Sequence, residues 1–177
     1  MDYKGTKTEQ NLLAAFAGES QARNKYTYYA SRARKDGYEQ IAAIFEATAN
    51  NEKEHAKMWF KELGGIGDTA ANLADAAAGE NYEHEKMYPE FAKIAEAEGF
   101  ASIATLFRMI AKAEVNHEKR YRLFVKKLAI GFFKSDDDET EWECTACGYI
   151  AVGEQAPKFC PVCGKPLAFF REAIDYD

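Results

Sequence analysis

The chain has 177 residues, of which 47% are hydrophobic and 29% charged, and its net charge is −6. This composition is typical of a globular protein and excludes disordered and collagen-like classes. The acidic balance disfavours nucleic acid as a partner. No apolar run approaches the roughly 18 residues of a membrane span, and the first residues show no secretory signal. We therefore expect a cytoplasmic protein without membrane contact, whose cysteines are thiols or metal ligands.

The chain up to residue 133 has the pattern of four helices. Thr6 and Glu9 have the spacing of a capping box that begins the first helix, and Gly37 ends it near residue 36. The second helix is expected over about 38–63, followed by a connection from Gly64 to about 75. The third helix is expected to reach about 97 and the fourth to span about 100–128. Pro89 lies inside the third helix and predicts a kink or a break there.

The helical part contains an internal repeat. Glu19 recurs as Glu80 at an offset of 61, and residues 41–45 recur as residues 103–107 at an offset of 62. The pair Glu52-x-x-His55 recurs as Glu114-x-x-His117, also at an offset of 62. The chain therefore holds a duplicated helical hairpin with one residue inserted in the second copy. Two such hairpins predict an all-α, ferritin-like four-helix bundle.

The repeated acidic residues and histidines predict a metal site. Residues three apart on a helix share a face, so each Glu-x-x-His can aim a carboxylate and an imidazole at one point. A glutamate from each of two helices and a Glu-x-x-His from each of the other two form the di-iron or di-manganese pattern of ferritin-like proteins. A solvated pair would explain one copy, but not two of the three histidines at equivalent positions. The expected ligands are Glu19, Glu52, His55, Glu80, Glu114 and His117.

Other side chains are expected near these ligands. Glu83 follows Glu80 by three residues and has no acidic counterpart in the first copy, so it would make the two metals inequivalent unless it is a surface charge. Tyr26 lies two turns beyond the first ligand and could donate a hydrogen bond to a carboxylate. Tyr88 is a second candidate for such a role, and core packing is the alternative for both tyrosines. We expect His84 to lie beside the site or to be exposed.

A separate cysteine module follows an acidic segment. Residues 1–133 carry 19 basic and 19 acidic side chains, whereas residues 134–177 carry four basic and ten acidic ones. Like charges keep a segment extended, so residues 134–141 are expected to link a bundle at 1–133 to a module at 142–177. Two Cys-x-x-Cys pairs predict a tetrahedral site for zinc or a single iron. Its ligands are Cys144, Cys147, Cys160 and Cys163.

Together these motifs resemble the rubrerythrin family, which has a ferritin-like di-iron domain followed by a rubredoxin-like domain. The resemblance is carried by residues 17–23, 52–55, 79–83, 87–89, 114–117, 142–149 and 160–164. It implies that the four cysteines bind iron. It also implies that the oxidised di-iron ligands are Glu19, Glu52, Glu80, Glu83, Glu114 and His117. On reduction one iron would exchange Glu83 for His55, and Tyr26 and Tyr88 match tyrosines that lie around the family's site.

The function implied by the resemblance is reduction of hydrogen peroxide to water, as oxidative-stress defence. Glu19, Glu52, Glu83 and Tyr26 are the expected catalytic groups. No dinucleotide fingerprint is present in the sequence, so electrons would come from an NAD(P)H-dependent reductase, directly or through a free rubredoxin. The resemblance further implies a homodimer or larger assembly, with helix exchange between copies left open. The alternative function is iron oxidation and storage with a structural zinc ribbon.

Overall fold

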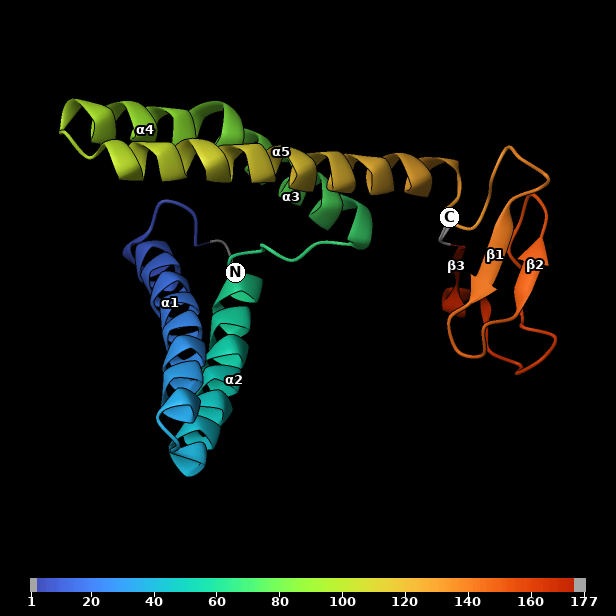
Figure 1. The fold of residues 1–177 in the computed structure, drawn as a ribbon, viewed down its shortest axis with the longest axis horizontal. Helices are drawn as coiled ribbons and strands as arrows, with labels where there is room; N and C mark the ends of the chain where they lie inside the picture. The colour runs from blue at the N-terminus through green and yellow to red at the C-terminus, as the bar shows by residue number, and fades with distance from the viewer. Residues whose placement is uncertain (1–2, 174–177) are drawn as a thin grey trace. The chain divides into compact units, whose positions relative to one another are not determined.

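A computed structural model describes residues 3–173 (Figure 1). The outer ends of the two expected domains, residues 1–2 and 174–177, lie outside the described residues. The helices are α1 (Lys7–Lys35), α2 (Glu39–Glu62), α3 (Thr69–Tyr82), the π-helical turn η1 (Glu83–Met87), α4 (Tyr88–Ala97) and α5 (Ala101–Ile130). The C-terminal part contains β1 (Glu141–Cys144), β2 (Ile150–Val152), the 3₁₀ turn η2 (Leu167–Phe169) and β3 (Phe170–Glu172). No helix among the described residues is long and apolar enough to cross a membrane.

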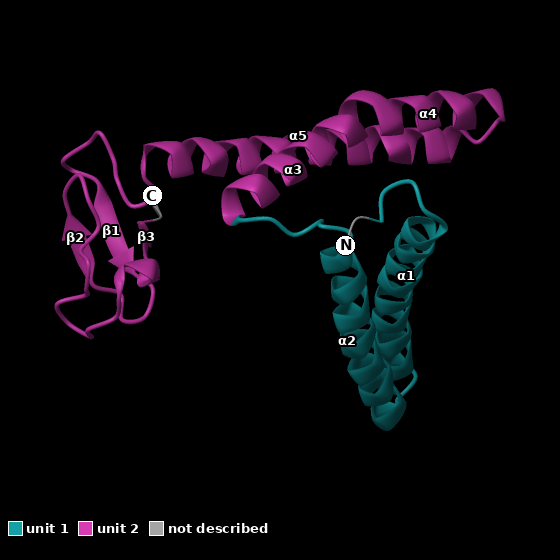
Figure 2. Ribbon diagram, turned by 180° about the vertical axis from the view of Figure 1, so that it is seen from behind, with its two compact units in different colours: residues 1–68 teal, residues 69–177 magenta. Residues whose placement is uncertain are grey.

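The chain divides into two compact units, residues 1–68 and 69–177 (Figure 2). Each unit contains one copy of the repeated helical hairpin, and the second also contains the cysteine module. The proposed linker at 134–141 has no helix before β1 begins at Glu141. Its first residues contact the module, because the Ser135 N–H donates to the Glu154 carbonyl at 2.8 Å. The domain boundaries drawn from charge remain a prediction.

The first unit is a hairpin of α1 and α2. Thr6 accepts a hydrogen bond from the Glu9 N–H at 3.1 Å, and the Glu9 carboxylate accepts one from the Gly5 N–H at 2.7 Å. The first contact satisfies an N–H group that the first turn of a helix leaves unpaired, and the second ties the preceding residue to the helix. The turn between the helices uses Gly37 at φ +86°, a conformation that glycine adopts without strain. The ends expected for both helices are therefore confirmed.

Small side chains set the spacing of this hairpin. Ala30, Ala33 and Ala42 are buried together, with Phe45 packed against them. Alanine leaves room for two helices to approach closely and is the best helix former. The larger apolar residues Ile41 and Ile44 are 47% and 60% exposed. The apolar face of α2 is thus only partly covered within its own hairpin.

In the second unit α3, η1 and α4 run alongside α5 (Figure 1). The expected start of the third helix near residue 75 was wrong, because α3 begins at Thr69. The preceding connection is correspondingly short. The segment from Thr69 onward is rich in alanine, whose helix propensity extends the helix where no apolar periodicity marks it.

The inserted residue of the second repeat falls in the π-helical turn. Tyr88 follows Glu80 by eight residues, whereas Tyr26 follows Glu19 by seven. In η1 the Tyr88 N–H donates to the Glu83 carbonyl, five residues back, so the turn takes up one more residue than an α-helical turn. Pro89, the second residue of α4, has no N–H to continue the regular ladder. The predicted interruption near this proline is confirmed and takes the form of a π-turn.

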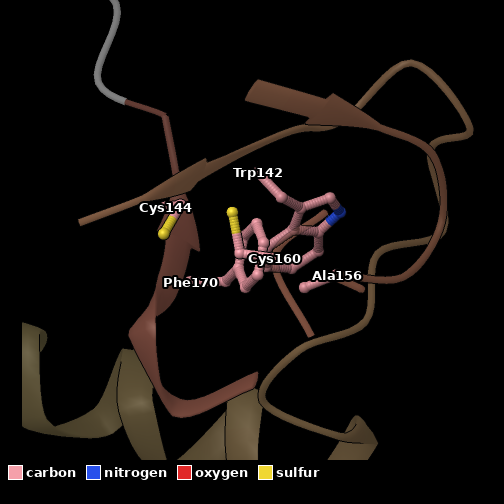
Figure 3. Packing of buried hydrophobic residues seen from close by; sticks show 5 residues of the cluster. All are labelled: Trp142, Cys144, Ala156, Cys160 and Phe170. Atoms are coloured by element: carbon pink, nitrogen blue, oxygen red, sulfur yellow. The ribbon is translucent and has the colours of Figure 1, made fainter. Parts of the chain in front are cut away.

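The cysteine module is a three-stranded antiparallel sheet with β1 between β2 and β3. Its core consists of Trp142, Cys144, Ala156, Cys160 and Phe170 (Figure 3). The indole N–H of Trp142 donates to the Gly153 carbonyl at 2.8 Å, so the buried ring has its polar atom satisfied. Two of the four cysteines expected to bind metal, Cys144 and Cys160, therefore belong to the core of the module.

Candidate metal centres

The first hairpin brings one carboxylate–histidine group together. Glu19 comes from α1, and Glu52 and His55 come from one face of α2. His55 Nδ1 lies 2.9 Å from a Glu52 oxygen and 3.9 Å from a Glu19 oxygen. The ligand atoms of the three residues all lie within 4.8 Å of one another. We call this group the first half-site.

The second hairpin repeats the arrangement with Glu80 from α3 and Glu114 and His117 from α5. His117 Nδ1 lies 2.5 Å from a Glu114 oxygen and 3.5 Å from a Glu80 oxygen. The three ligand atoms again lie within 4.8 Å of one another. This second half-site is formed by the residues at which the sequence repeat places it.

Both half-sites have carboxyl groups close enough to share a proton. A hydrogen bond with Glu52 raises the pKa of Glu19, and charge repulsion adds to it. Burial raises the pKa of Glu80, and a hydrogen bond with Glu114 adds to it. A divalent cation would replace the shared proton and remove the repulsion. Carboxylate and imidazole ligands suit iron, manganese or zinc, so the donor sets fit a metal.

Glu83 lies beside the second half-site without belonging to its three-residue group. Its negative charge contributes to raising the pKa values of Glu80 and Tyr88. Burial is the largest cause of the raised pKa of Tyr88, and the charges of Glu83, Glu114 and Glu80 follow. The Tyr88 phenol therefore keeps its proton and can act as a hydrogen-bond donor.

The two candidate tyrosines occupy equivalent aromatic clusters. Tyr26 packs against Tyr29 and Phe45, with ring centroids 6.2 and 6.1 Å away. Tyr88 packs in the same way at the corresponding repeat positions, against Phe91 and Phe107, at 6.5 and 6.0 Å. Core packing, the alternative role, is thus part of what both rings do.

A buried polar network next to the second half-site was not predicted from the sequence. One Glu118 oxygen accepts from the His84 ring nitrogen Nε2 at 2.6 Å, and the other accepts from Asn81 at 3.2 Å and from Arg122 Nε at 2.5 Å. Hydrogen bonds from His84 and then Arg122 lower the pKa of Glu118 to about 2. The His84 side chain is half-buried, at 9% exposed, and lies in this network beside the second half-site. The signal in the sequence was Glu118 itself, which stands where the first repeat has Ala56.

The four cysteines converge in the module. Cys144 Sγ lies 3.7 Å from Cys163 Sγ, and Cys147 Sγ lies 3.6 Å from Cys160 Sγ. All four sulfur atoms lie within 4.8 Å of one another. A tetrahedral ion with metal–sulfur bonds of about 2.3 Å places its sulfur ligands about 3.8 Å apart. The separations therefore fit a tetrahedral iron or zinc site.

Tight turns follow both cysteine pairs. Gly148 and Gly164 have φ of +75° and +70°, as expected for the glycine after each pair. The close sulfur atoms share protons in the metal-free module: N–H groups of Cys163 and Val162 lower the pKa of Cys160 to about 7 against the effect of burial, whereas burial and hydrogen bonds with the other three sulfur atoms raise the pKa of Cys147 to about 12. Cys144 and Cys160 are buried, whereas Cys147 and Cys163 are exposed. The site therefore lies at the surface of the module.

Comparisons with known proteins identify the family of this chain. A family model described as Rubrerythrin matches residues 10–125, and one described as the rubrerythrin rubredoxin-like domain matches residues 142–171. Rubrerythrin of Porphyromonas gingivalis is 50% identical, over 95% of this chain and 90% of that protein. Rubrerythrin of Nitratidesulfovibrio vulgaris is 47% identical, over 95% of both chains. A solved structure of fully reduced, all-ferrous nigerythrin is 34% identical over 94% of this chain and 86% of that one, with a TM-score of 0.35. The chain belongs to the rubrerythrin family.

Proposed function

We propose that this protein is a non-haem di-iron peroxidase that reduces hydrogen peroxide to water. The observation that carries the proposal is the presence of two kinds of metal site in one chain, the carboxylate–histidine half-sites and the Cys₄ site. Rubrerythrins hold a di-iron centre and a rubredoxin-like iron, and the donor groups described above fit both. Bound iron would supply the electrons and the Lewis acidity that peroxide reduction needs.

The side chains of the bundle have separate tasks in this proposal. Glu19, Glu52, Glu80, Glu114 and His117 hold the metals. Glu83 and His55 are the two groups that exchange between oxidation states, as the family resemblance implies. Tyr88 keeps its proton beside three carboxylates, so it is suited to donate a hydrogen bond to one of them. We assign Tyr26 the same role in the first hairpin.

A complete centre requires both half-sites, and the apolar surface of each hairpin supports their association. On α2, Ile41 and Ile44 precede Glu52 at helical spacing, so the three side chains lie on one face of the helix, which we call the stripe of this hairpin. Ile103 and Leu106 have the same relation to Glu114 on α5 and are 44% and 51% exposed. Closing one stripe on the other would bury these side chains and bring the half-sites together. The partner hairpin belongs to the same chain or to a second copy in a homodimer or larger assembly.

The Cys₄ site is suited to deliver electrons to the bundle one at a time. Cys147 and Cys163 are exposed, so an electron-donor protein can contact two of the side chains that would bind the metal. Residues 134–177 are strongly acidic, which favours a donor with a basic surface. We propose an NAD(P)H-dependent reductase as the source, acting directly or through a free rubredoxin. The docking would then weaken as salt screens the charges.

The alternative function is iron oxidation and storage, with zinc in the Cys₄ site. The sulfur geometry fits zinc as well as iron. Storage needs no rechargeable one-electron donor, however, whereas repeated reduction of peroxide does. The presence of the cysteine module in the same chain therefore favours the peroxidase.

The test compares two preparations of the full chain, with iron in the bundle and either iron or zinc in the Cys₄ site. Peroxide consumption is measured with excess NAD(P)H and a rubredoxin reductase. The proposal predicts turnover only with iron at the cysteines. Equal turnover in both preparations would remove the Cys₄ site from the electron path. Uptake of many irons per chain by the zinc form would support storage instead.

A further inference from the structure

The network around Glu118 is the one buried charged group among the described residues that the proposed chemistry does not use. The three hydrogen-bond partners of Glu118 lie on different helical segments. His84 lies in η1, Asn81 in the last turn of α3, and Arg122 one turn further along α5. Both carboxylate oxygens are thus occupied, and a carboxylate this well satisfied holds its partners at fixed positions.

The network and the π-turn occur together. In the first repeat the residues that correspond to Asn81, Glu118 and Arg122 are Ser20, Ala56 and Phe60, which carry no charge. There α1 is continuous from Lys7 to Lys35, and no extra carboxylate corresponds to Glu83. The second repeat therefore differs from the first in three ways. It contains one more residue, it has an extra carboxylate at Glu83, and its buried Glu118 binds the π-turn.

The network holds the residue that follows Glu83 in the chain. His84 is the next residue in η1, and its ring is bonded to Glu118 at Nε2 and lies 3.3 Å from Glu85 at Nδ1. Glu83 instead acts on Glu80 and Tyr88, on the side of the half-site. A single π-turn is rare within helices and concentrates at functional sites. Fixing the His84 ring to α5 therefore fixes the backbone that carries Glu83.

We propose that Glu118 is a positioning residue for the metal centre, which holds η1 through His84 and thereby sets the Glu83 carboxylate where it can bind metal. Groups behind metal ligands commonly act in this way, and their loss weakens metal binding by about 10- to 100-fold. This inference rests on the proposed di-iron centre but not on its reaction with peroxide.

The test measures metal affinity in the full chain, with Ga³⁺ as a redox-inert substitute for the oxidised iron that Glu83 is expected to bind, and with the Cys₄ site filled beforehand with Zn²⁺. The unmodified protein should bind two Ga³⁺ in the bundle. In Glu118→Leu one of them should bind about 10- to 100-fold more weakly while the other is unchanged. The matched control is Glu96→Leu, which removes an exposed carboxylate paired with Arg108 in the same hairpin and should leave both affinities unchanged.

A double-mutant cycle separates positioning from general damage. If Glu118 acts through Glu83, Glu118→Leu should have no further effect on Ga³⁺ affinity in a Glu83→Ala background. An undiminished effect there would mean that Glu118 acts through its neighbour His117 or through overall stability, and would overturn the proposal. Glu118→Gln retains an acceptor oxygen and should recover part of the affinity.

A second variant covers the case in which Glu118→Leu does not fold, as judged by far-ultraviolet circular dichroism. His84→Phe breaks only the link to η1 and leaves the bonds of Glu118 to Asn81 and Arg122 in place. It should reproduce the weakened binding of one Ga³⁺. Normal binding of two Ga³⁺ by this variant would overturn the proposal, whereas failure of the unmodified protein to bind Ga³⁺ in the bundle would count against the di-iron centre itself.

Discussion

Replacing Trp142 by alanine should weaken metal binding at the Cys₄ site without any change to a ligand. Trp142 is 1% exposed and packs with Cys144 and Cys160 in the core of the module. Truncating a buried tryptophan costs roughly 3–5 kcal/mol. In a small module metal binding and folding are one equilibrium, so this cost appears as lost metal affinity. At about 1.4 kcal/mol per tenfold, the affinity should fall by about 100- to 4,000-fold.

The assay titrates Co²⁺ against a competing chelator and follows the cobalt–thiolate absorption, which reports on the cysteine site alone. Phe159→Ala is the matched control, because it removes an aromatic ring that is 66% exposed in the same module. Substitutions at exposed positions change stability by roughly 0.5 kcal/mol or less, so its affinity should stay within about threefold of the unmodified protein. A loss of less than tenfold for Trp142→Ala would refute the coupling between the core and the metal site.

Three further predictions concern the bundle and the electron path. Glu52→Ala should lower the iron bound by the bundle, whereas Glu54→Ala, which removes a carboxylate paired with Lys57, should not; metal analysis after gel filtration compares the two. The pKa of Glu80 is raised above 4.5, its value in the unfolded chain. The folded, metal-free protein therefore binds the Glu80 proton more tightly than the unfolded chain does. Stability should therefore fall as pH rises from 4.5 through the raised pKa, and Glu80→Gln should flatten this slope in denaturant titrations. Zinc in the Cys₄ site should abolish reduction of the bundle iron by NAD(P)H and reductase, as followed by absorption.

Much of the helical part could be predicted, because helix ends and repeats depend on residues that are close together in the sequence. The Thr6 cap and the Gly37 turn were identified from residue type alone, and the repeat located both half-sites. The predicted fold class and family were confirmed by the matching family models. The cofactors predicted for the family, a di-iron centre and a rubredoxin-like iron, were confirmed in the same way.

The features that were missed depend on longer-range or non-periodic causes. The start of α3 at Thr69 follows from alanine propensity rather than from an apolar pattern. To predict the π-turn, two observations would have had to be combined: the repeat offset increases by one residue between Glu80 and Tyr88, and Pro89 follows directly. The environment of Glu118 depends on contacts across 34 residues of chain to His84, which no local pattern reveals. The roles of individual ligands remain predictions.

The central claim is that electrons pass from the Cys₄ site through the bundle to peroxide. The most direct test reduces the iron-loaded protein without air and adds one equivalent of hydrogen peroxide per di-iron site, while visible absorption is recorded. The account predicts that the red thiolate-to-iron band, absent after reduction, returns rapidly and that Glu52→Ala blocks its return. No red band in any state, or an equally rapid return in Glu52→Ala, would contradict it.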